Sequence, residues 1–218
     1  MVVKKQKLIE IIFTKAGVFK TVWVQDFEDW GRRDYGRPQV EAHIGMLPPK
    51  VARMMLNIAV SGKRLAVSTV LDPFCGVGTI LMEGCELGLT MIGSDIGPKQ
   101  VARTKKNLES FGMKAQVFVG DARDVKEKVD AIVTEADLGP NDQRSITNDQ
   151  QTKLHRLYLD CFKNWKNLTK RIVIALPDEE IIDKVINMGY ILEVGPFIYG
   201  RPQAKVKRHI LVFKNVTR

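Results

Sequence analysis

The chain has 218 residues, a formal net charge of +9 and a pI near 9.5, and 44% of its residues are hydrophobic. This length suits one sizeable α/β domain with its own core. No apolar run is long enough to cross a membrane, and residues 1–7 lack the apolar core of a secretory signal, so we expect a cytoplasmic protein.

The three cysteines are too few and too irregularly spaced for a disulfide framework, which indicates reduced thiols. Cys75 and Cys85 lack the spacing and the histidine partners of a zinc site, so they are predicted to pack in the core, and no metal site is predicted. The basic residues are clustered along the chain, which favours a nucleic-acid partner over evenly spread charge. The two clusters are Arg32, Arg33 and Arg37, and Arg201, Lys205, Lys207, Arg208 and His209.

Residues 1–40 are predicted to form an N-terminal hairpin and arm. Two β-rich runs, 8–13 and 18–24, flank a turn at 14–17 and predict the hairpin. The polar segment 25–38 has interleaved aromatic residues and is predicted to be an ordered arm. We interpret residues 41–218 as one domain, with no independent second domain.

Within that domain, strand and helix patterns alternate. Helices are predicted at 48–62, 79–87, 98–111, 150–167 and 178–188, and strands at 65–71, 90–96, 115–119, 129–134, 171–176, 191–199 and 206–214. This alternation predicts an α/β fold of the Rossmann-like kind, with a mostly parallel sheet and helices on both faces.

A glycine turn follows the strand at 65–71, in the stretch 72–79 (DPFCGVGT). Glycines between a strand and a helix N-terminus let a ligand approach the backbone closely, as in nucleotide sites. Leu81 stands where a dinucleotide fingerprint has its third glycine, and no Gly-Lys-Ser/Thr follows Gly78, so neither that fingerprint nor a P-loop is complete. Asp72 would repel a pyrophosphate but attract the ammonium and sulfonium groups of S-adenosylmethionine (SAM).

The stretch 72–79 closely resembles the first motif of the RNA guanosine-N2 methyltransferases that are often linked to a THUMP domain. The resemblance extends to 33–38 (RDYGRP), 45–50 (GMLPPK) and 200–202 (GRP), so it covers most of the chain. It implies the class I methyltransferase fold, with a seven-stranded sheet closed by an antiparallel C-terminal hairpin. The N-terminal part is too short for a THUMP module. Either the sequence belongs to a longer protein, or a protein partner supplies the RNA grip.

The resemblance also implies the cofactor site, with residues 45–47 at the methionine end of SAM. Asp95 ends the second strand, where a carboxylate reaches ribose hydroxyls; its alternative role is to cap the next helix. Asp121 is implied to contact the adenine amino group, and its alternative role is to cap a short helix from Ala122. The predicted cofactor residues are Gly45, Met46, Leu47, Asp72, Pro73, Phe74, Cys75, Gly76, Gly78, Thr79, Asp95, Ile96, Asp121 and Ala122.

The fourth strand ends in the loop 135–138 (EADL), where amino-group methyltransferases carry Asp or Asn, two prolines and an aromatic residue. A carboxylate and a backbone carbonyl there accept the hydrogens of an exocyclic base amine and aim its nitrogen. Glu135 and Asp137 are therefore the predicted catalytic residues, although Leu138 cannot stack an extruded base. Three interpretations stay open: an amine held with altered geometry, a different acceptor, or a degenerate or engineered site with weak activity.

The substrate is predicted to be RNA, held by basic groups that contact phosphates. The turn at 199–202 and the alternating residues Lys205, Lys207 and His209 would supply these groups on one face of the last strand. The predicted substrate-binding residues are Arg37, Leu138, Tyr199 and Arg201. On the long helix, His155 is expected at the surface, and Tyr158 and Trp165 in the core.

The sequence thus predicts a SAM-dependent methyltransferase of a base amine, and the resemblance points to guanine N2 of tRNA. One rival is a methyltransferase of DNA or nucleotide amines, and another is a catalytically weak module that binds SAM and RNA. No Pro-Cys pair ends the fourth strand, which disfavours cytosine C5 methylation through a thiolate.

Overall fold

The computed structural model describes residues 8–40, 46–61, 68–139, 145–200 and 207–216. Its helices are α2 (Phe27–Asp34), α3 (Pro49–Val60), α4 (Thr79–Glu86), α5 (Pro98–Ser110), α6 (Asn148–Trp165) and α7 (Ile182–Asn187). Its strands are β1 (Ile11–Thr14), β2 (Gly17–Lys20), β3 (Thr69–Asp72), β4 (Thr90–Asp95), β5 (Gln116–Val119), β6 (Ala131–Glu135), β7 (Arg171–Leu176), β8 (Tyr190–Tyr199) and β9 (Arg208–Asn215).

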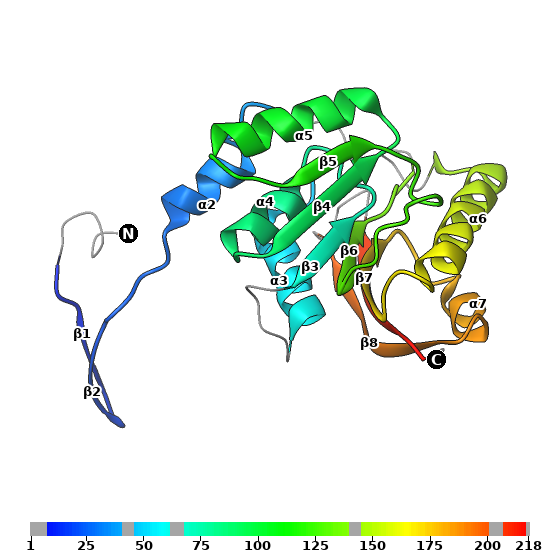
Figure 1. Ribbon diagram of the computed structural model, residues 1–218. Helices are drawn as coiled ribbons and strands as arrows, with labels where there is room; N and C mark the ends of the chain where they lie inside the picture. The colour runs from blue at the N-terminus through cyan, green and yellow to red at the C-terminus, as the bar shows by residue number, and fades with distance from the viewer. Residues whose placement is uncertain (1–7, 41–45, 62–67, 140–144, 201–206, 217–218) are drawn as a thin grey trace.

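The body of the protein is built on a seven-stranded sheet, in the order β5-β4-β3-β6-β7-β9-β8 (Figure 1). The strands from β5 to β7 pair in parallel, and β9 pairs antiparallel with both of its neighbours. The predicted mostly parallel sheet with an antiparallel C-terminal hairpin is therefore confirmed. So is the N-terminal hairpin, which is formed by shorter strands than predicted.

The central strands β3, β6 and β7 are buried on both faces, because their apolar side chains point alternately to either side of the sheet. On β7, Val173 and Ala175 join the core under α3, α4 and α5, and Ile172 and Ile174 join the core under α6 and α7. Trp165 of α6 lies in the second core, and its Nε1 donates a 2.9 Å hydrogen bond to the carbonyl of Ala122. Tyr158 is also buried, so Tyr158 and Trp165 are both in the core as predicted.

The arm at 25–38 contains a helix, α2, that sequence reasoning did not separate from its surroundings. Asp26 caps its N-terminus by accepting a hydrogen bond from the backbone N–H of Asp29. Arg33 on this helix is only 1% exposed, and its Nε donates a 2.6 Å hydrogen bond to Oε1 of Glu83 on α4. Arg37 is 3% exposed. The basic cluster at 32–37 therefore does not form a surface patch as expected, because two of its three arginines are buried.

The second correction concerns His155, which is buried and not at the surface. Its Nε2 lies 2.9 Å from Oδ2 of Asp178, in the segment after β7. Asp178 also accepts a hydrogen bond from the backbone N–H of Glu180, which forms a turn there, and α7 begins only at Ile182.

The hairpin of β1 and β2 stands apart from the body in Figure 1 and carries apolar side chains that remain exposed. A two-stranded hairpin alone is marginally stable in water. The exposed apolar residues of the hairpin and the following linker are Leu8, Ile9, Ile11, Ile12, Phe13, Val18, Phe19, Val22 and Trp23. In the described part of the chain, no helix is both long and apolar enough to cross a membrane.

Candidate functional site

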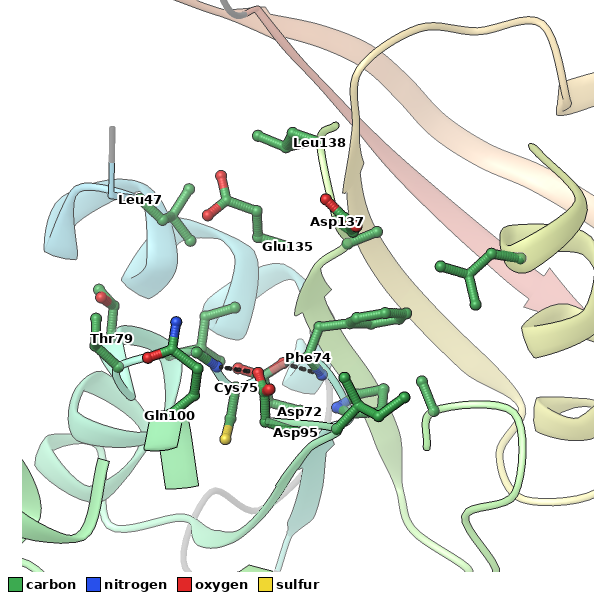
Figure 2. A pocket seen from close by; sticks show the side chains of 18 of the residues that line it. Leu47, Asp72, Phe74, Cys75, Thr79, Asp95, Gln100, Glu135, Asp137 and Leu138 are labelled. Atoms are coloured by element: carbon green, nitrogen blue, oxygen red, sulfur yellow. Dashed lines mark hydrogen bonds between the residues drawn. The ribbon is translucent and has the colours of Figure 1, made fainter. Parts of the chain in front are cut away.

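A cavity of about 630 Å³ lies at the carboxyl ends of β3, β4 and β6, where open α/β sheets bind their ligands (Figure 2). Most of the predicted cofactor residues line it. These are Met46, Leu47, Asp72, Pro73, Phe74, Cys75, Gly76, Thr79, Asp95, Ile96, Asp121 and Ala122. Gly45 lies outside the described residues. Sequence reasoning did not single out Gln100, Arg123 and Leu157, which also line the cavity.

The two glycines of the turn at 72–79 have different structural roles. Gly76 has a φ of +52°, and a Cβ there would have only the carbonyl oxygen of Phe74 within 4.0 Å, so the turn is open at this point. Gly78 does not line the cavity. Its φ is +89°, and a Cβ there would lie 2.8 Å from Cγ2 of Thr104 on α5. Gly76 therefore leaves room for a ligand, and Gly78 lets α5 pack against the turn.

Asp72 is buried at the end of β3, where its Oδ1 accepts hydrogen bonds from Oγ1 of Thr134 (2.6 Å) and from the backbone N–H of Phe74 (3.2 Å; Figure 2). Burial raises its pKa to about 7, because a carboxylate removed from water favours its neutral form. The two hydrogen bonds act against this shift. A cationic ligand in the cavity would favour the ionised form.

Asp95 ends β4 and clamps the glycine turn. Its Oδ2 accepts a 3.0 Å hydrogen bond from the backbone N–H of Gly76, and its Oδ1 accepts a 2.8 Å bond from that of Gly97. The alternative of a capping role at the start of α5 is thus partly realised, while the carboxylate still lines the cavity.

Asp121 follows β5 in a turn, and no helix begins at Ala122. Its carboxylate accepts hydrogen bonds from the backbone N–H and the guanidinium of Arg123, which hold its pKa below the usual range. No sequence pattern marked Arg123, apart from its position two residues after Asp121.

The cavity wall is strongly acidic. Five carboxylates line it, and among the described lining residues Arg123 is the only cation. This charge favours a cationic ligand and disfavours a pyrophosphate. The acidic groups are Asp72, Asp95, Asp121, Glu135 and Asp137. The volume, the open turn at Gly76 and these carboxylates together fit SAM, which carries a sulfonium and an ammonium group.

Glu135 ends β6 and points into the cavity beside Leu47 (Figure 2). Nε of Arg208 on β9 donates a hydrogen bond to its Oε1. Arg208 is 6% exposed, and Nδ1 of its neighbour His209 lies 2.7 Å from Oε1 of Glu179. The basic cluster at 201–209 therefore does not lie wholly on the surface: Arg208 is buried, and His209 is half-buried and contacts Glu179. Arg201 and Lys205 fall outside the described residues.

The loop after Glu135 is fixed by α6, because the hydroxyl of Tyr158 donates to the backbone carbonyl of Asp137. The Asp137 side chain accepts a 2.9 Å hydrogen bond from the N–H of Gly139. Leu138 lines the cavity and is 9% exposed. Phe74 is the only aromatic residue among the described lining residues. Trp30, Tyr35, Phe197 and Tyr199, which could otherwise stack an extruded base, do not line the cavity.

The remaining predicted substrate residues lie apart from the cavity. Arg37 supports it from behind: its Nη1 donates a 2.7 Å hydrogen bond to Oγ1 of Thr79, and its Nη2 lies 2.8 Å from Sδ of Met46. Tyr199 is exposed at the end of β8.

The sheet order, the reversed last strand and the glycine turn after β3 define a class I methyltransferase fold. The crystal structure of TrmN from Thermus thermophilus has this fold: it superposes with a TM-score of 0.68 at 18% identity, over 92% of this chain and 56% of that one. Residues 37–194 match the family described as RMKL-like, methyltransferase domain, and the chain belongs to this family.

Two curated relatives are tRNA (guanine(10)-N2)-dimethyltransferases. The protein of Methanothermobacter thermautotrophicus is 41% identical over 142 residues, which are 64% of this chain and 40% of that protein. The protein of Pyrococcus abyssi is 31% identical over 190 residues, which are 84% of this chain and 52% of that protein. The chain thus spans about half or less of the length of these relatives.

Proposed function

We propose that the protein is a SAM-dependent methyltransferase that acts on an exocyclic base amine of RNA, with guanine N2 of tRNA as the substrate. The observation that carries the proposal is the position of Glu135, on the wall of the acidic cavity that begins at the glycine turn. The names of the curated relatives support both the reaction and the substrate.

In this proposal, the residues around the turn at 72–79 hold the cofactor. Asp95 would accept hydrogen bonds from the ribose hydroxyls, and Asp121 would accept one from the adenine amino group. Asp72 would face the positively charged end of SAM. When bound, SAM supplies a methyl group on a positive sulfur. Burial raises the pKa of the Cys75 thiol, so this cavity-lining cysteine stays neutral and is not the nucleophile.

Glu135 and the loop after it would hold the acceptor. An exocyclic amine is conjugated with its ring, so its nitrogen is a good nucleophile only when its lone pair is released from that conjugation. The carboxylate of Glu135 accepts one N–H, with Asp137 beside it, and leaves the nitrogen facing the methyl group for an in-line displacement. The methylated nitrogen would then lose one proton to the Glu135 carboxylate, which passes it to solvent, and no covalent enzyme intermediate would form.

The proposal includes three further elements. Arg37, Leu138, Tyr199 and Arg201 would contribute to substrate binding, Arg37 through its support of the cavity wall. A protein partner would supply part of the RNA grip, for which the exposed apolar hairpin offers a surface. Residues 1–40 would form the hairpin and arm, 41–218 the methyltransferase domain, and the enzyme would act in the cytoplasm.

A second candidate is a catalytically weak module that binds SAM and RNA. It is favoured by the Leu138 side chain, which offers no stacking face, and because the half-buried Phe74 is the only aromatic residue among the described residues of the cavity wall.

The first experiment supplies methyl-labelled SAM with unmodified tRNA, with DNA in parallel, and identifies labelled nucleosides by mass spectrometry. Label on a guanine amine of tRNA supports the proposal, and label in DNA favours the rival substrate. The isosteric variant Glu135→Gln is the matched control, with SAM binding measured by calorimetry. SAM binding without transfer to any acceptor would favour the binding module.

A further inference from the structure

Arg208 lies behind the site, at the edge of the sheet where the parallel strands end. Its neighbour His209 pairs with Leu176, the last residue of β7, so Arg208 itself stands just beyond that strand. From there its side chain reaches past β7 to Glu135, the last residue of β6. The Arg208 side chain is 7% exposed and that of Glu135 21% exposed.

The surroundings of Glu135 explain why its hydrogen bond with Arg208 is important. Ala175 pairs with it on β7, and Leu47 lies beside it near the start of α3 (Figure 2), so its neighbours on these two sides are apolar. The charged groups on its other sides are Asp72 on β3 and Asp137 in the following loop, and both are carboxylates. Burial raises the pKa of Glu135, and the positive charge and hydrogen bond of Arg208 oppose that rise.

We propose that Arg208 is a positioning residue of this site: it ties Oε1 of Glu135 and thereby directs Oε2 toward the N–H of an incoming base amine. This inference rests on the function proposed above. In this role Arg208 acts through Glu135, and it does not itself line the cavity. An arginine suits this role because its Nε–H is part of a planar group with a fixed direction, which a lysine ammonium does not reproduce.

The charge-removing test is Arg208→Met, with Lys214→Met as the matched control. Lys214 is an exposed residue of the same strand and loses the same charge. In Arg208→Met, we expect the pKa of Glu135, followed by carboxyl ¹³C NMR without any cofactor, to rise by about one unit or more. The acidic limb of the kcat/KM profile should move to higher pH by the same amount, and kcat at pH 7 should fall about tenfold or more. The Kd for SAM should stay within about twofold in both variants, and Lys214→Met should keep the wild-type profile.

The conservative variant Arg208→Lys separates charge from direction. It should keep the acidic limb near the wild-type pH but lower kcat several-fold. A kcat equal to that of wild type would overturn the positioning role, and so would an acidic limb that does not move in Arg208→Met. If Arg208→Met does not fold, the kcat of Arg208→Lys tests the positioning role by itself. The double variant Glu135→Gln/Arg208→Met leaves no unpaired charge, so it should recover the fold.

The failure of the proposed function would look different. If the wild-type protein methylates no acceptor, that function is wrong, but the NMR titration still reports whether Arg208 controls Glu135. An unchanged Glu135 titration in Arg208→Met would overturn the inference by itself.

Discussion

Oγ1 of Thr134 donates a 2.6 Å hydrogen bond to Oδ1 of Asp72, which joins the end of β6 to the end of β3 inside the protein. Asp72 is thereby held at the cavity wall with a pKa of about 7, raised chiefly by burial. A buried carboxyl that titrates near neutrality makes its charge depend on the ligand and on the pH. Two predictions concern this group.

The first is that SAM affinity rises with pH. Below pH 7 Asp72 is mostly protonated, and a cationic ligand prefers the ionised form. We therefore expect the Kd for SAM to fall about tenfold between pH 6 and pH 8. Calorimetry at several pH values measures this. The amino group of SAM titrates in the same range, so Asp72→Asn is the necessary control. This variant should bind SAM more weakly, and its Kd should lose most of its pH dependence. An equal pH dependence in the variant and the wild type would show that Asp72 does not cause it.

The second prediction concerns stability in the absence of ligand. The folded-state pKa of Asp72 lies above its ordinary value of 3.8, so its favourable contribution to stability is complete below about pH 4. That contribution is lost as the pH rises through about 7. Urea unfolding should show Asp72→Asn gaining stability relative to wild type between pH 5 and pH 8. Thr134→Val removes a hydrogen bond that stabilises the ionised form, so it should shift the midpoint of this pH dependence to higher pH. A midpoint that stays in place would show that the Thr134 bond does not influence Asp72.

The third prediction concerns Gly78, whose left-handed backbone faces Thr104. Gly78→Ala should lower the free energy of unfolding by about 1–3 kcal/mol, since it combines a strained φ with a close contact to Cγ2. Thr104→Ser removes that methyl group and keeps the hydroxyl that donates to the carbonyl of Gly76. The double variant should therefore recover part of the loss in urea unfolding. If it recovers nothing, backbone strain alone accounts for the cost.

The fold could be predicted because its signals are local. The alternation of apolar strands with amphipathic helices predicted the sheet, and the glycine turn at 72–79 predicted the position of the cavity. Helix α2 was missed because its polar sequence has a single buried residue, Arg33, to mark the inward face. The boundary of α7 was missed because Asp178 is engaged by His155, a residue from another element.

The partners of the charged residues could not be predicted, because they lie far away in the sequence. Arg33 binds Glu83, 50 positions away, and Arg208 binds Glu135, 73 positions away. A run of arginines and lysines looks the same whether its members face RNA or a buried carboxylate. Only the topology of the sheet brings Arg208 to the site, by placing β9 next to β7 with reversed direction.

The last prediction tests whether Arg33 serves the fold or an RNA surface. Its guanidinium is buried between Asp29 and Glu83, and Glu83 is also bound by Nε of Arg53 at 2.8 Å. Removing one partner of a buried ion pair leaves the other charge uncompensated, so Arg33→Gln should lower the free energy of unfolding by about 3 kcal/mol. The neighbouring Arg32 is exposed, and Arg32→Gln should change the free energy of unfolding by less than about 0.5 kcal/mol. Urea unfolding compares the two variants directly. Equal stability of both, with a reduced salt dependence of tRNA binding only in Arg33→Gln, would instead assign Arg33 to an RNA contact.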